Sequence, residues 1–232
     1  MPVIQDKEFG RITVKRNTKA TAVRVRVAPN GTLRVSAPLY TPLLVVRRII
    51  QRSRGELRDM IEHHHGQTMQ FSDDIKIGKS HHLIVQNTEA SKTTVRRVKQ
   101  RIMVHLTKGD TINEPVIQEM IRDVVTTALR REAKSYLPKR LQYLATQHGY
   151  SFTKVRFSHA SSRWGSCSSN GTISLNIALM KLPFEQIDYV LLHELTHTEH
   201  MNHSPEFWQA METTDPQYKI HKNNLKQVSP SL

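Results

Sequence analysis

Two histidines and a glutamate are grouped in a short apolar stretch of the chain. Residues 188–197, DYVLLHELTH, carry His193, Glu194 and His197 among leucine, valine and tyrosine. Positions i and i+4 of an α-helix lie on one face, so both imidazoles can reach one metal ion. Glu194 lies about 100° further round the helix, where it can reach a water on that ion without ligating it. The spacing predicts two zinc ligands and a general base for metal-activated water.

His203 is the predicted third ligand. In a continuous helix it would lie about 15 Å along the axis from His193, so the chain must turn back just after His197. Asn202 tolerates a left-handed conformation, and Ser204 followed by Pro205 is typical of the cap and first residue of a new helix. We therefore expect a turn that brings His203 back to the other two histidines.

The same apolar stretch allows an alternative in which no metal binds. A helix this hydrophobic is normally buried, and a buried carboxylate and two imidazoles are costly without partners. In the alternative, ordinary core contacts satisfy the histidines. The spacing from His193 to His203 matches the metzincin pattern, but His200 stands where that pattern has glycine, so we do not assign that family.

The 232-residue chain is basic, with a formal net charge of +14 and 38% hydrophobic residues. Residues 1–110 hold 21 Lys and Arg against 9 Asp and Glu, or +12, and the remainder holds 13 against 11, or +2. Such a surface can attract nucleic acid or nucleotides, although a solvated basic face is an equal alternative. A single cysteine, a charged N-terminus and the lack of a long apolar run predict a cytoplasmic protein with no membrane span.

The first half of the chain predicts a β-rich module with one basic helix. Residues 11–36 alternate apolar and polar side chains around a PNG turn at 29–31, which indicates an antiparallel β-meander. Helical spacing follows over residues 43–61, with arginines on the other side and exposed histidines expected at 63–65. Further strands are expected within 75–106, with packing or surface roles for their histidines. We place the domain boundary near residue 110, giving modules 1–110 and 111–232.

The second half predicts a mixed α and β domain. A helix begins near residue 115, Pro138 is expected to interrupt it, and a second short helix ends at Gly149. Residues 152–182 follow as strand, loop, turn and strand, and a last helix is expected in the tail after residue 215. The fold class is therefore α+β, with the HExxH motif on a buried helix.

The loop RWGSCSS lies shortly before the predicted zinc helix. Its small residues allow a close approach of backbone to a ligand, so Trp164, Gly165 and Ser166 are candidate substrate-binding residues. An ordinary turn pinned by a buried Trp164 is an equal alternative. Tyr218 is a further candidate, as a hydrogen-bond donor to an oxyanion. Cys167 is expected to be a small buried thiol.

The combination of RWGSCSSNGTISLN, DYVLLHELTH, NHSPEFW and DPQYK resembles the YgjP-like (WLM/SprT-related) metallopeptidases, minimal zinc peptidases of the gluzincin type. The resemblance implies a minigluzincin-like zinc domain, a Zn²⁺ ion held by His193, His197 and His203, and Glu194 as base. It also implies that the strand near WGSC is an edge beside the cleft, where an extended peptide adds as a strand. A bacterial member of the family is described as a UTP pyrophosphatase, so family membership leaves the substrate open.

Three functions follow as hypotheses. The first is a zinc-dependent peptidase that acts on peptides or proteins, with Glu194 as general base. The second is a metal-dependent nucleotide pyrophosphatase, suggested by the basic first half. The third is a zinc protease that docks on nucleic acid through that half, although aromatics make up only 6% of the chain.

Overall fold

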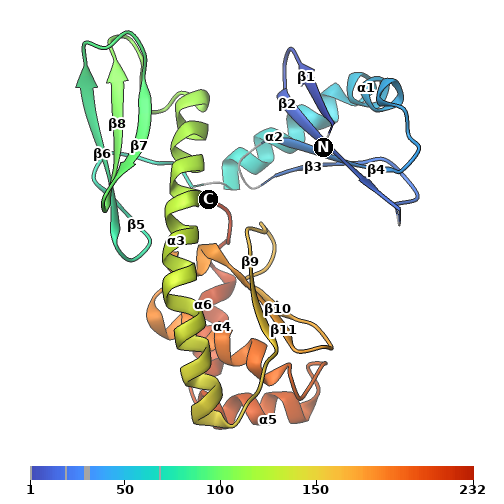
Figure 1. Ribbon diagram of the computed structural model, residues 1–232, viewed down its shortest axis with the longest axis vertical. Helices are drawn as coiled ribbons and strands as arrows, with labels where there is room; N and C mark the ends of the chain where they lie inside the picture. Colours follow the sequence, from blue (N-terminus) through green and yellow to red (C-terminus); the bar gives the residue numbers. More distant parts are fainter. Residues whose placement is uncertain (1, 19, 29–31, 68) are drawn as a thin grey trace. The chain divides into compact units, whose positions relative to one another are not determined.

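The computed structural model of the chain describes residues 2–18, 20–28, 32–67 and 69–232, and the side chains of 62–67 lie outside the description. Contacts divide it into an N-terminal unit, residues 1–69, and a C-terminal unit, residues 70–232 (Figure 1). Both units combine helices with sheets, so the predicted α+β class is confirmed. The expected turn at 29–31 and the side chains of His63 to His65 fall outside the described residues.

The N-terminal unit contains a four-stranded sheet in the order β1-β2-β4-β3. Its strands are β1 (Val3–Asp6), β2 (Gly10–Asn17), β3 (Arg24–Val27) and β4 (Leu33–Pro38). The predicted antiparallel meander is wrong, because β2 and β4 pair in parallel. β4 buries Leu33, Val35 and Ala37 and takes a central place, whereas β3 exposes both its arginines and forms an edge.

Two helices cover this sheet where the sequence predicted one. Helix α1 (Leu43–Arg52) and helix α2 (Arg54–Gln67) are separated at Ser53. Val46, Ile50 and Leu57 pack into the same core as the strands. Arg54 bonds to Asp6 at 2.9 Å and to Glu8, so acidic residues of this unit neutralise part of its basic helix.

The C-terminal unit begins with a second sheet whose order, β5-β6-β8-β7, repeats that of the first. Its strands are β5 (Ile75–Ile77), β6 (His81–Thr88), β7 (Thr94–Val98) and β8 (Arg101–Thr107), and β6 again pairs with β8 in parallel. We expected these strands in the first module, but contacts place the division after Met69. The cause is their packing against helix α3, which begins at residue 115.

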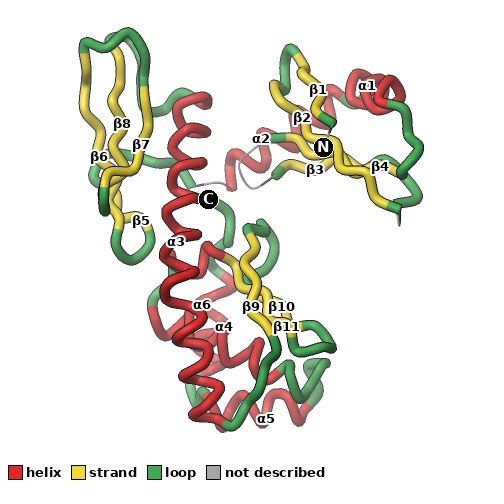
Figure 2. Tube along the Cα trace, in the orientation of Figure 1, coloured by secondary structure: helices red, strands yellow, loops and turns green. Residues whose placement is uncertain are grey.

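Helix α3 (Pro115–His148) runs unbroken for 34 residues, so the predicted interruption at Pro138 is wrong (Figure 2). A proline inside a helix costs about 3 kcal/mol. Burying one leucine side chain returns about 1.5–3 kcal/mol, and Leu129, Leu137 and Leu141 are fully buried along this helix. Core packing therefore outweighs the local cost of Pro138. Gly149 ends the helix with a left-handed φ of 76°, as expected.

Three strands and four helical segments complete the C-terminal unit. Strands β9 (Lys154–Ser158), β10 (Gly165–Cys167) and β11 (Thr172–Asn176) form a sheet in the order β10-β11-β9, so β10 is at an edge, as the resemblance implied. The 3-10 helix η1 (Ile177–Lys181) leads to α4 (Phe184–Thr196), and α5 (Pro205–Thr214) and α6 (Tyr218–Lys226) follow. Helix α4 packs against α3, α5, α6 and β10.

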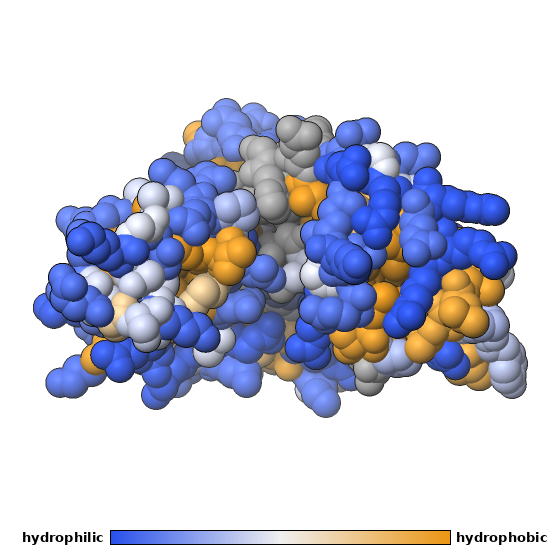
Figure 3. Space-filling view, turned by 90° about the horizontal axis from the view of Figure 1, so that it is seen from above, coloured by the Kyte–Doolittle hydropathy of each residue, from blue (hydrophilic) through white to orange (hydrophobic). Residues whose placement is uncertain are grey.

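Hydrophilic side chains cover much of the molecular face in Figure 3, and hydrophobic ones gather in smaller patches. In the N-terminal unit, the exposed hydrophobic side chains include Tyr40 and Leu44. Within the described part of the chain, no helix combines the length and the apolar character needed to cross a membrane.

The tight turn before β6 gives a prediction about stability. Gly78 has a φ of 62°, and a Cβ there would lie 2.6 Å from Cδ2 of Leu129 and closer still to the buried Glu132 carboxylate. Gly78→Ala is therefore expected to lower the free energy of unfolding by about 2–4 kcal/mol, through left-handed strain and steric overlap together. Gly149→Ala is the matched control, because Gly149 also has a positive φ but no atom within 4 Å of such a Cβ. Denaturant unfolding that gives equal losses for the two variants would contradict this account.

Candidate active site

Three histidines meet where helix α4 ends. His193 lies in the last turn of α4, His197 is its C-cap, and His203 lies in the loop before α5. Each histidine offers one ring nitrogen, and these three nitrogens lie within 4.8 Å of one another. The Nε2 atoms of His193 and His203 are 3.1 Å apart. The expected turn after His197 is present, and Ser204 and Pro205 begin α5 as predicted.

The geometry and chemistry of this cluster fit a zinc ion. A tetrahedral zinc with Zn–N bonds of about 2.0–2.1 Å separates two ligand nitrogens by about 3.3 Å, close to the spacing of His193 and His203. Three imidazoles leave one coordination position open, as in catalytic zinc sites. Burial, reinforced by the neighbouring His197 and His203, lowers the pKa of His193 to about 3. The His193 imidazole is therefore neutral at ordinary pH, the form that can ligate a metal ion.

The orientation of His197 is fixed by the turn that follows it. Its Nδ1 donates a hydrogen bond of 2.9 Å to the backbone carbonyl of His200. Such a bond selects the tautomer in which Nε2 carries a free lone pair. His200 therefore contributes through its backbone, a role that the sequence motif did not indicate.

An aromatic layer supports the three imidazoles. The Phe207 ring is fully buried and lies 4.6–5.0 Å, centroid to centroid, from all three histidine rings. Trp208 stacks on His203 at 5.5 Å and on Tyr218 at the same distance. Phe207 and Trp208 both belong to helix α5 and pack against His203. They restrict the imidazole orientations and keep one side of the cluster dry.

Glu194 is buried beside the histidines and points toward strand β10. Only 4% of its surface is exposed, and its Oε2 atom has no hydrogen-bond partner within the described residues. Burial raises the pKa of Glu194 to about 8, and the charge of Arg163 opposes that rise. A buried carboxyl group with a raised pKa is a stronger base once it is ionised, and its free oxygen is suited to accept a proton from a substrate or water.

Gly165 makes room for the Glu194 side chain. A Cβ at Gly165 would lie 2.7 Å from Cγ of Glu194 and 2.8 Å from its Cδ, distances that real side chains essentially never show. Trp164 and Gly165 line one cavity of about 230 Å³ together with His193 and Glu194. Two of the predicted substrate residues are therefore at the site.

Asn176 fixes the loop that carries Trp164 and Gly165. Its fully buried side chain donates to the carbonyls of Ala160 at 2.7 Å and Arg163 at 2.8 Å, and its backbone N–H donates to the carbonyl of Trp164. One asparagine therefore ties β11 to the strand that faces Glu194. Asn176 could not be identified from the sequence, because its partners are backbone groups with no sequence pattern.

The other predicted residues do not line the cavity beside Glu194. Ser166 pairs with Ser174 of β11 and does not line that cavity. Tyr218 is buried against Trp208 and lines a neighbouring cavity of about 390 Å³. Cys167 is partly buried rather than fully buried, and burial, followed by the charge of Glu194, raises the pKa of its thiol.

A row of lysines on α6 adjoins the histidine cluster. Lys219, Lys222 and Lys226 line the same cavity as Trp208 and Tyr218, and the Lys222 ammonium lies 3.7 Å from the Trp208 ring centroid. The charge of Lys222 contributes to the lowered pKa values of His193 and His203. The spacing of these lysines in KIHKNNLK is the signal that the sequence analysis overlooked.

Comparison with known proteins places the chain among peptidases. A family model described as YgjP-like, metallopeptidase domain, matches residues 21–228. Among solved structures, the crystal structure of the metallopeptidase zymogen of Pyrococcus abyssi abylysin is 27% identical, with a TM-score of 0.36, and the match covers 39% of this chain and 91% of that chain. A search of curated proteins found no match. The family model gives no support to the nucleotide or nucleic-acid hypotheses.

The contact between Gly165 and Glu194 yields a prediction about catalysis. Gly165→Ala is expected to displace the Glu194 carboxylate while leaving the histidines in place, because the three atoms nearest to the added methyl group all belong to the glutamate. Peptide hydrolysis should fall about 100-fold or more, the usual contribution of a general base, with metal content unchanged. Ser174→Ala on the neighbouring strand is the control. A Gly165→Ala variant that cleaves peptides as fast as wild type would contradict this role for Gly165.

Proposed function

The chain belongs to the YgjP-like metallopeptidase family, and we propose that it cleaves peptide bonds with a zinc ion held by His193, His197 and His203. The observation that carries this proposal is the meeting of three imidazoles beside a buried carboxylate with a free oxygen. A zinc ion bound there supplies a Lewis acid, which polarises a peptide carbonyl and makes a water molecule more acidic.

Glu194 is proposed as the general base. Its unpartnered Oε2 accepts the proton of the attacking water, and the same carboxyl group then delivers that proton to the leaving amine. The packing of Gly165 limits where this carboxyl group can move. Burial by helix α4 and strand β10 excludes bulk water, which would otherwise compete as proton donor and acceptor.

Strand β10 is proposed to bind the substrate backbone. It lies at the edge of its sheet, so one side of its backbone has no neighbouring strand within that sheet. An extended peptide that pairs with this edge gains main-chain hydrogen bonds, and its path runs beside Trp164 and Gly165. Main-chain pairing of this kind holds the substrate in register and leaves side-chain selection to the surrounding pockets.

The first test separates metal binding from proton transfer. Glu194→Gln is expected to bind zinc normally and to lose about 100-fold or more in peptide hydrolysis, whereas His203→Ala should lose most of the bound metal. Metal analysis and peptide-library cleavage measure the two effects. Glu199→Gln and His200→Ala are the matched controls, because Glu199 is exposed and the His200 backbone carbonyl survives substitution. Normal cleavage by Glu194→Gln would rule out the proposed base.

A second test concerns substrate preference. Lys222 lies beside the proposed metal ligands with an ammonium group that no carboxylate pairs within the described residues. We expect peptides with an acidic side chain next to the scissile bond to be cleaved preferentially. Lys222→Ala should reduce kcat/KM about tenfold for an acidic peptide and little for its amide counterpart. Lys134→Ala on α3 is the control, and equal losses for both peptides would show that Lys222 does not select acidic side chains.

A further inference from the structure

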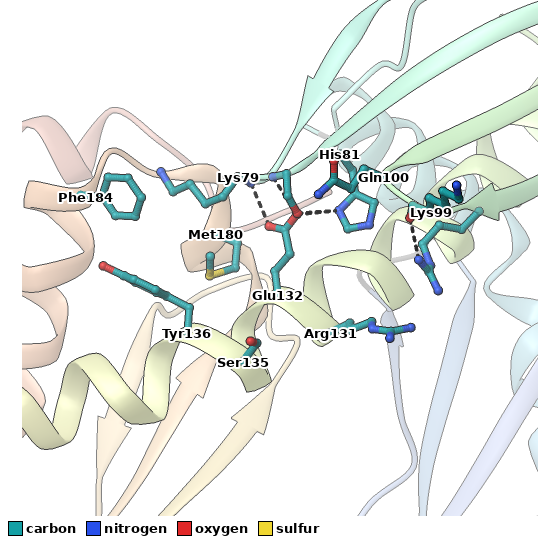
Figure 4. Close-up of a pocket in the computed structure, with 12 residues that line it drawn as sticks. Lys79, His81, Lys99, Gln100, Arg131, Glu132, Ser135, Tyr136, Met180 and Phe184 are labelled. Atoms are coloured by element: carbon teal, nitrogen blue, oxygen red, sulfur yellow. Dashed lines mark hydrogen bonds and ion pairs between the residues drawn. The ribbon is translucent and has the colours of Figure 1, made fainter.

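A third cavity, of about 390 Å³, lies within the C-terminal unit, away from the histidine cluster. None of the described residues that line it belongs to the candidate active site. Four segments form its walls: the turn before β6, the turn between β7 and β8, the middle of α3, and the region from η1 to the start of α4 (Figure 4). Its volume is in the range of small-molecule sites.

The centre of the cavity wall is a buried, fully satisfied carboxylate. Glu132 accepts hydrogen bonds from the backbone N–H groups of Lys79 and Ser80, at 2.8 and 3.0 Å. The Ser80 hydroxyl and Nδ1 of His81 donate to the same carboxylate, each at 2.6 Å. These four hydrogen bonds stabilise the negative charge of Glu132 and fix the position of this wall. The wall therefore offers little attraction to a metal cation.

One end of the cavity is cationic. Arg97, Lys99 and Arg131 line it, and within the described residues none of the three forms an ion pair with a carboxylate. The Arg97 guanidinium donates to the carbonyl of Lys99 at 2.6 Å and so supports the turn between β7 and β8. Positive charges gathered around a concave surface without anionic partners attract an anion.

Lys99 occupies a backbone position that favours glycine. It is in the two-residue turn between β7, which ends at Val98, and β8, which begins at Arg101, and its φ is 54°. Hairpin turns of this kind are dominated by Gly, Asn and Asp, because a side chain at positive φ is strained. A lysine at such a position keeps a positive charge at the cavity at a cost in stability, which is typical of a functional site.

The other end of the cavity is aromatic, and the Lys79 ammonium lies 4.2 Å from the Phe184 ring centroid there. Tyr136 and Phe184 pack with ring centroids 5.5 Å apart, and Met180 is buried beside them. Phe184 remains 49% exposed, although it is a large hydrophobic side chain. Figure 4 shows this aromatic group on one side of Glu132 and His81, and Lys99 with Arg131 on the other. The two ends therefore offer different chemistry to one ligand.

We propose that this cavity binds a small molecule that carries two or more anionic groups beside a planar ring. The ring packs on Tyr136 and Phe184, and the phosphate or carboxylate groups bind Lys99 and Arg131. Guanidinium and ammonium groups recognise both kinds of anion through charge-assisted hydrogen bonds. The proposal stands on residues outside the candidate active site, so it does not depend on the proposed peptidase mechanism.

Calorimetry on the purified full-length chain tests the site, with EDTA present so that no metal ion can hold the anion. The probes are adenosine triphosphate, inorganic triphosphate and adenosine. Adenosine triphosphate should bind more tightly than either of its parts, because only it occupies both ends of the cavity. A benzenetricarboxylate titrated in parallel identifies the anionic group that the cationic end prefers. If it binds more tightly than adenosine triphosphate, the natural ligand carries carboxylates. If it binds more weakly, the natural ligand carries phosphates.

Variants locate the binding. Lys99→Gly and Arg131→Ala are each expected to weaken adenosine triphosphate binding about tenfold, and Lys99→Gly should melt at the same or a higher temperature, because glycine relieves the strained turn. Phe184→Ala should weaken the binding of adenosine triphosphate but leave the binding of inorganic triphosphate unchanged. Arg130→Ala removes the same charge from the neighbouring α3 position outside the cavity. This variant should bind each probe as tightly as wild type.

Three results would overturn the proposal. An equal loss in Arg130→Ala and Arg131→Ala would show that general charge attraction, not the cavity, binds the probe. Inorganic triphosphate that binds as tightly as adenosine triphosphate would remove the role of the aromatic end. An absence of binding by adenosine triphosphate and the benzenetricarboxylate alike would reject the site.

Discussion

The arrangement of the active site depends on a carboxylate that is buried without a partner. Glu194 lies in helix α4, whose other buried side chains are mostly apolar, and its Oε2 has no hydrogen bond from the described residues. Isolating such a group from water is unfavourable, and the surrounding fold must supply the stability. Helix α4 does so by burying Leu191, Leu192 and Leu195 among its neighbours. A hydrophobic helix is therefore what allows a reactive carboxylate to persist.

The remaining contacts around Glu194 give that carboxylate a defined place. Gly165 leaves the space that the side chain occupies, and Asn176 holds the backbone around Gly165. Earlier in α4, Asp188 accepts two hydrogen bonds from Arg140 of α3, at 2.8 and 2.6 Å. The helix is thus anchored to α3 at its beginning and confined by β10 near its end. Positioning comes from ordinary packing and backbone hydrogen bonds rather than from further titratable groups.

Sequence reasoning succeeded where one short segment contains the whole signal. The HExxH spacing, the turn after His197 and the Ser204–Pro205 helix start are local, so the meeting of the three histidines could be predicted. It failed where distant segments decide the outcome. The alternation in β2 and β4 cannot reveal that they are parallel neighbours, and the Pro138 penalty is outweighed only by leucines packed from elsewhere. Lys222 reaches the site through a separate helix, so the lysine spacing can indicate a basic helix face but not the aromatic and histidine residues beside it.

The repeated strand order has a consequence for how the chain folds. In each four-stranded sheet the two outer pairs, β1-β2 with β3-β4 and β5-β6 with β7-β8, join strands close in sequence. Such local pairings close short loops and form quickly, whereas the central parallel pair joins strands across a longer stretch of chain. We therefore expect each sheet to assemble from two hairpins, with docking of the hairpins as the slower event. Docking of β6 on β8 completes the sheet that packs on α3, the helix against which α4 packs in turn.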